Sequence, residues 1–147
     1  MKASLDHIGI AVSDLAAALA FYRDALGLEI DVPEEVPTQR VRARFVRLEG
    51  ARAAGTGTAG PGLELLEATA EDSPIAKYVG RRGPGLHHIT LRVEDLRASL
   101  ADLKSRGVRL IDEAPRPGAH GALVAFIHPS SAHGVLVELM ERRSAER

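Results

Sequence analysis

Two histidines and two glutamates stand at matching places in the two halves of this 147-residue chain. His7 lies in LDHIGIAV and His88 in LHHITLRV, while Glu64 lies in LELLE and Glu138 in VELME. Neutral imidazole and carboxylate groups are borderline-to-hard ligands, suited to divalent Co, Mn, Ni, Zn or Fe. Together they would leave part of an octahedral ion open to a bidentate substrate. The pattern therefore indicates a divalent metal site at an approximate twofold axis.

Each of these side chains also has an ordinary structural explanation. A lone histidine in a strand is more often a packed structural residue than a ligand, and a glutamate in a segment such as LELLE more often faces solvent. Internal repetition makes all of them harder to explain separately, although duplicated structural residues also persist. From the residues alone, both interpretations stay open.

The pairing rests on an internal repeat with an offset of 81 residues. Residues 5–20 and 86–101 are identical at nine aligned positions, and LELLE matches VELME. His88 has its counterpart in His7, whereas His87 aligns with Asp6. Successive side chains of a strand face opposite sides. His88 is therefore expected to face the ion, and His87 to point away from it in a structural or supporting role.

Each copy of the repeat predicts a β-α-β-β-β unit. Alternating apolar residues predict strands, over residues 5–12, 28–32, 41–48 and 63–67 and over 86–93, 109–111, 122–128 and 135–140. Asp14 and Asp95 are expected N-caps of the two helices, and Gly27 and Gly107 their C-terminal ends. A short helix over 73–80 and a linker up to residue 85 join the units. The Gly-rich residues 51–62 are interpreted as a long hairpin connection.

Composition excludes several classes of function. The chain has no cysteine, so disulfides, thiol catalysis and cysteine metal sites are ruled out. A net charge of −1 and an aromatic content of 3% give neither a basic field nor stacking platforms for nucleic acid. No signal peptide or long apolar span is evident. We expect a cytoplasmic protein with no nucleic-acid or membrane partner.

Longer segments carry a family resemblance. LDHIGIAV and FYRDALGLE resemble the vicinal-oxygen-chelate superfamily, which includes glyoxalase I. LELLEATAEDSPIAKYV, GLHHITLRVEDL and GVRLIDEAPRPGAHGALVAFIHP are similar to the methylmalonyl-CoA epimerases within it, and the similarity runs over about residues 5–141. The resemblance implies an α+β fold in one domain, 1–147. Two tandem βαβββ modules, about 5–68 and about 86–141, would form a cupped, mostly antiparallel eight-stranded sheet around the metal.

The resemblance also implies the chemistry. The metal ligands would be His7, Glu64, His88 and Glu138, and the ion Co²⁺, with Mn²⁺, Ni²⁺, Zn²⁺ or Mg²⁺ as substitutes. The substrate would be an acyl-CoA whose α-proton is removed to give an enediolate and returned on the opposite face, which interconverts (2R)- and (2S)-methylmalonyl-CoA. A homodimer is the expected assembly.

Two acid/base groups, or one with access to both faces, are needed for that reaction. Glu138 is the candidate for one of them. In some family members, a glutamate in the strand corresponding to 41–48 acts as a base. This chain has Ala43 at that position. Glu34 and Glu35 are expected to be exposed loop charges, and a water relay is another route. The second group is therefore unassigned.

A few other residues are candidates for substrate contact. They are Gln39, Gly118, His120 and His128. The alternatives are a plain hairpin turn for residues 118–121 and strand-end packing for His128. Two competing functions are a glyoxalase-I-type isomerase of a hemithioacetal and a non-catalytic small-molecule-binding protein of the same fold.

Overall fold

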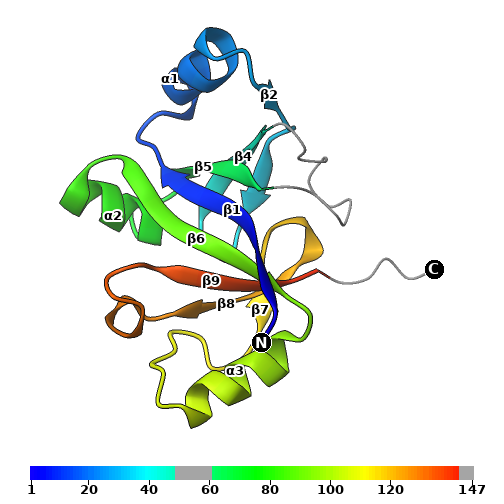
Figure 1. The fold of residues 1–147 in the computed structure, drawn as a ribbon. Coiled ribbons are helices and arrows are strands. Elements are labelled where there is room, and N and C mark those ends of the chain that lie inside the picture. The colour runs from blue at the N-terminus through cyan, green and yellow to red at the C-terminus, as the bar shows by residue number, and fades with distance from the viewer. Residues whose placement is uncertain (49–60, 143–147) are drawn as a thin grey trace.

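The computed structural model describes residues 1–48 and 61–142 (Figure 1). Its strands are β1 (Ala3–Ala11), β2 (Glu29–Ile30), β3 (Glu34–Val36), β4 (Val41–Arg47), β5 (Gly62–Ala68), β6 (Gly85–Val93), β7 (Arg116–Pro117), β8 (Leu123–Ile127) and β9 (Val137–Glu141). Its helices are α1 (Leu15–Leu19), which continues as the π-helix η1 (Ala20–Ala25), α2 (Pro74–Arg82), α3 (Leu96–Ser105) and the short 3₁₀ turns η2 (Ala119–Gly121) and η3 (Pro129–Ser131). The connection expected over 51–62 falls almost wholly outside the described residues.

All nine strands belong to a single curved sheet. Its order is β2-β4-β5-β1-β6-β9-β8-β7, and β3 pairs with β4. The pairs β1–β5 and β6–β9 are parallel and the other pairs are antiparallel. The α+β class and mostly antiparallel sheet are confirmed. The expected count of eight strands is wrong.

The difference in strand count has local causes. Residues 109–111 form only an isolated bridge from Leu110 to Ile127. β3 is three residues long and lies between Pro33 and Pro37, so it shows no periodic pattern. β7 ends in Pro117, which an edge strand tolerates because one of its sides needs no N–H donor. Short edge strands of this kind carry too few residues for sequence alternation to show.

β1 and β6 join the two halves of the chain at the middle of the sheet (Figure 1). They pair antiparallel with two irregularities in register. Leu5 pairs with Leu91 and His7 with Thr90, so Asp6 is an extra residue on β1. In the same way, His87 is extra on β6. These bulges occupy equivalent places in the repeat, and each bulge interrupts the alternation of faces beside a site histidine.

Each long helix packs on the strands of its own half. Leu15 and Leu19 of α1 pack with Val46 and Leu65, whereas α3 packs against β6, β8 and β9. In Figure 1, α1 lies at the top, to the left of β2, and α3 lies at the bottom, near β7. Among the described residues, no helix has the length and apolar character needed to cross a bilayer.

The N-terminus of each of these helices is capped twice. As the sequence predicts, the side chains of Asp14 and Asp95 each accept a hydrogen bond from the backbone amide three residues further along the chain. A second carboxylate arrives from the last strand of the same half. Glu67 accepts from the Leu15 amide at 2.6 Å, and Glu141 accepts from the Leu96 amide at 2.7 Å. Helix and strand are thereby tied together in both halves.

Loss of this tie should lower stability. We expect Glu141→Ala to reduce the free energy of unfolding by ~1–2 kcal/mol, because the Leu96 amide loses its acceptor. Urea unfolding followed by circular dichroism measures the change. Glu113→Ala, which removes an exposed pair with Lys104, serves as the control and should change stability by less than ~0.5 kcal/mol. Equal effects of the two substitutions would contradict a capping role for Glu141.

Candidate metal centre and active site

β1 and β6 set the two histidine rings side by side. The register pairs His7 with Thr90 and Gly9 with His88. The ring centroids of His7 and His88 lie 5.5 Å apart at an interplanar angle of 82°. His88 lies directly over Gly9, where a Cβ atom would come within 2.1 Å of the ring. Gly9 is therefore needed because only a residue without a side chain leaves room for the imidazole.

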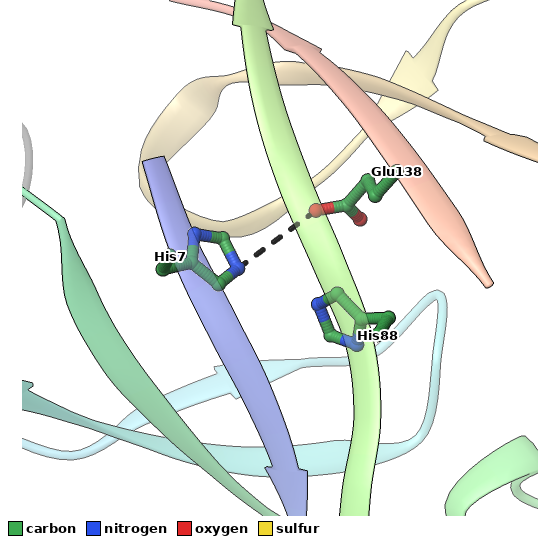
Figure 2. A group of neighbouring side chains, drawn as sticks. All are labelled: His7, His88 and Glu138. Atoms are coloured by element: carbon green, nitrogen blue, oxygen red, sulfur yellow. Dashed lines mark ion pairs between the residues drawn. The ribbon is translucent and has the colours of Figure 1, made fainter. Parts of the chain in front are cut away.

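Both glutamates reach the same place from flanking strands. Glu64 comes from β5 and Glu138 from β9, and both are buried with the histidines. Glu64 Oε1 lies 3.7 Å from His7 Nε2 and 4.0 Å from His88 Nε2, and Glu138 Oε1 lies 3.9 Å from His7 Nε2. Figure 2 shows His7, His88 and Glu138 converging from β1, β6 and β9. The sequence-predicted set is thus brought together.

The spacing and donors fit a divalent ion. Ligand atoms about 2.1 Å from one ion lie at most about 4.2 Å apart. One atom each of His7, His88 and Glu138 form a group within 4.8 Å of one another, close to that limit. His88 Nε2 is buried and has no hydrogen-bond partner, which is costly for a polar atom unless a further ligand satisfies it. The donor set suits the borderline metals.

Asp6 orients His7 through a contact with Nδ1, the ring nitrogen that faces away from the other site residues. The bulge lets the Asp6 carboxylate reach His7 Nδ1 at 2.8 Å, although the two residues are adjacent. Arg92 and Arg142 donate to the other oxygen, Oδ1, at 2.8 and 3.1 Å. Burial alone would raise the pKa of Asp6, but His7 and Arg142 hold it well below its usual range. A permanent carboxylate at Nδ1 leaves Nε2 as the ligand atom.

His87 takes the corresponding position behind His88. Its Nδ1 lies 2.9 Å from His88 Nδ1, and its ring stands edge-on to Tyr78. Burial lowers the pKa of His87 to about 4, so the ring is neutral at physiological pH and can accept a hydrogen bond from the His88 ring. The expected supporting role is consistent with this geometry. The bulge explains why two adjacent histidines contact each other.

Thr90 is a site residue that the sequence did not single out. Its side chain is fully buried, and its hydroxyl donates to Glu138 Oε1 at 2.8 Å and lies 3.0 Å from His7 Nε2. Thr90 aligns with Gly9 in the internal repeat, so this position differs between the halves. This difference, two residues beyond the matching histidines, was the available signal.

Burial dominates the electrostatics of the cluster. It raises the pKa of Glu138 to about 7 and also raises the pKa of Glu64. Burial disfavours charge on His7 as well, but the nearby carboxylates of Glu64, Asp6 and Glu138 raise its pKa. The pKa of His88 is well below its usual value because of burial and the neighbouring histidines. The His88 imidazole is thus neutral, which is the form that coordinates a metal ion.

A small cavity, partly open to solvent, adjoins the cluster. Its lining includes His7, Glu64 and Glu138, and of the proposed substrate contacts it includes Gln39 and His120. Among the described residues, Gly118 and His128 are not part of this lining. Gly118 instead packs against Val124, and His128 Nδ1 accepts from the Ser130 amide and caps η3.

Comparison with known proteins agrees with the geometry. Residues 6–126 match the Glyoxalase/Bleomycin resistance protein/Dioxygenase superfamily. The mitochondrial methylmalonyl-CoA epimerase of Bos taurus is 38% identical over 92% of this chain and 72% of its own length. The ethylmalonyl-CoA/methylmalonyl-CoA epimerase of Cereibacter sphaeroides is 39% identical over 95% and 98%. The chain belongs to the methylmalonyl-CoA epimerase family.

A solved structure from the family extends the likeness to three dimensions. A variant of the Streptomyces coelicolor methylmalonyl-CoA epimerase, in complex with 2-nitronate-propionyl-CoA, superposes with a TM-score of 0.86. It is 38% identical, and the match covers 98% of this chain and 97% of that one. The fold implied by the sequence resemblance is therefore that of the epimerases.

One expectation near the site is wrong. Glu34 is not a loop charge, because it lies in β3 opposite Ala43 and its side chain is only 26% exposed. Its carboxylate accepts from the His120 amide at 2.7 Å and pairs with His120 Nδ1 at 2.5 Å. Glu35 is exposed, as expected, but lies in the same strand and pairs with Arg42.

The ligand positions can be tested by metal binding alone. We expect His88→Ala to abolish Co²⁺ binding to the metal-stripped chain, measured by calorimetry. Gly9→Ala should weaken binding on the order of 100-fold, because the new Cβ displaces the His88 ring. His87→Ala should weaken it only about 10-fold. Gly80→Ala is a matched control, since a Cβ there meets nothing. If His87→Ala lost Co²⁺ binding and His88→Ala retained it, the assignment of His88 as the ligand would be refuted.

The raised pKa of Glu138 predicts a pH effect on the metal-free chain. Between pH 4.5 and about 7, the unfolded chain releases this proton while the folded chain keeps it, so stability falls as pH rises. We expect the free energy of unfolding of Glu138→Gln, relative to the parent, to increase across that window. Thermal unfolding at several pH values gives this difference. A constant difference would show that the carboxyl is ionised throughout.

Proposed function

We propose that this chain interconverts (2R)- and (2S)-methylmalonyl-CoA by removing the α-proton and returning one on the opposite face. The convergence of His7, His88, Glu64 and Glu138 beside a partly open cavity carries the proposal. Identity of 38–39% to named epimerases over more than nine-tenths of the chain supports the choice of substrate. Removal of an α-proton beside a thioester needs stabilisation of the resulting negative charge.

We propose that those four side chains hold a divalent ion, with Co²⁺ as the first candidate and Mn²⁺, Ni²⁺, Zn²⁺ or Mg²⁺ as alternatives. Such an ion acts as a Lewis acid on substrate oxygens. The chain's own part is to keep the ligands oriented. Asp6 and His87 support the two imidazoles from their Nδ1 atoms, and Thr90 holds Glu138 Oε1.

Glu138 is the proposed acid/base group on one face of the substrate. It lines the cavity and is almost fully buried, so its carboxyl can meet a substrate bound there directly. Apolar residues of the same cavity fit a small alkyl substituent such as the α-methyl group. They include Val36, Val41 and Leu66.

Hydrogen exchange tests this proposal directly. In deuterated water, the Co²⁺-loaded protein should incorporate deuterium at the α-carbon of methylmalonyl-CoA while its configuration inverts. Glu138→Gln should slow inversion by about 100-fold or more, and the exposed Glu113→Gln should leave it unchanged. Absence of exchange with both Co²⁺ and Mn²⁺ would contradict the proposal. Turnover of a methylglyoxal–thiol adduct instead would favour a glyoxalase-type isomerase.

A further inference from the structure

Inversion through a planar intermediate needs a proton donor on the face opposite the base, and Ala43 offers none. The candidates for this second donor are the titratable residues that line the cavity. His7, Glu64 and Glu138 belong to the proposed metal site. Asp6 is engaged by His7, Arg92 and Arg142, and the guanidinium of Arg142 does not give up its proton. His120 is the titratable lining residue that has no other role.

His120 lines the same cavity as Glu138 but is carried by a different element. It lies in η2, in the second half of the chain, but its contacts belong to the first half. Its ring packs on Phe45 with centroids 5.1 Å apart, and Phe45 packs on His7 at 5.2 Å. One aromatic ring therefore separates His120 from the metal cluster. Its side chain is 24% exposed, so it can meet both substrate and solvent.

Glu34 fixes the orientation of this ring. One carboxylate oxygen accepts from the His120 backbone amide and the other pairs with Nδ1. The amide contact holds a left-handed backbone, with φ of 54° and ψ of 33°, that a residue other than glycine adopts rarely. A carboxylate beside Nδ1 favours a proton on that nitrogen over one on Nε2, and Nε2 is then the atom that can act as a base.

We propose that His120, positioned by Glu34, is the second acid/base group of the epimerase reaction. This inference rests on the proposed function. In one direction, His120 Nε2 takes the α-proton, and the C–H electron pair moves into the enolate of the thioester. Glu138 then gives its proton to the opposite face of the α-carbon. In the other direction, Glu138 takes the proton and the His120 imidazolium donates. Exchange with water, or the reverse turnover, resets both groups.

The experiment follows each epimer separately, with the Co²⁺-loaded protein in deuterated water. His120→Asn is the variant, because asparagine tolerates the left-handed backbone. We expect inversion to fall about 100-fold or more, while one epimer still exchanges its α-proton with retention, through Glu138, at near the parent rate. The other epimer should lose exchange. Glu34→Gln should show the same selectivity with a loss on the order of 10-fold.

Matched controls separate chemistry from structure. His133→Asn changes another histidine with φ of 54°, and Glu35→Gln changes the exposed neighbour of Glu34. Both should retain parent rates. All variants should bind Co²⁺ with parent affinity, since His120 is not a ligand. Inversion by His120→Asn within a few-fold of the parent, or equal loss of exchange from both epimers, would overturn the inference alone. Failure of the parent itself to exchange would overturn the proposed function and this inference with it.

Discussion

The antiparallel pairing of β1 and β6 is the constraint on which the site depends. Each strand contributes one imidazole to the shared face, and each contains one extra residue next to it. The two bulges put Asp6 and His87 behind the rings that they support, at 2.8 and 2.9 Å. Gly9 gives His88 its space on the opposite strand. A shift of this pairing by one residue would turn the histidines to opposite faces and separate all these contacts.

The site concentrates ionisable groups where water is scarce. Without an ion, burial raises the pKa of Glu138 and of Glu64, and His88 Nε2 has no hydrogen-bond partner among the described residues. A divalent cation would offset the cost of burying negative charge here and would give the imidazole nitrogens a partner at the same time. A bound cation would therefore stabilise this cluster of buried ionisable groups. Binding should release protons.

Sequence repetition predicted the ligand set and most of the sheet, because each half repeats both the strand that carries the histidine, at an offset of 81 residues, and the closing strand that carries the glutamate, at an offset of 74 residues. It selected His88 rather than His87 as the expected ligand, and His88 is the one that lies in the group with His7 and Glu138. It could not predict contacts across the sheet that involve residues with no equivalent in the other half of the chain. Thr90 matches a glycine, and the contact of Glu34 with His120 joins residues 86 positions apart through a strand too short to show a pattern.

The carboxylates that cap α1 and α3 have a consequence for mispairing. Glu67 and Glu141 each stand three residues beyond a glutamate of the metal cluster, on the same strand. A slip of β5 or β9 by two residues would keep the correct face toward the core and would move its glutamate by roughly 7 Å. That slip would also pull the cap from its helix. Each helix thus helps to fix the register of the strand that carries a metal-site glutamate, through a capping glutamate three residues further along that strand.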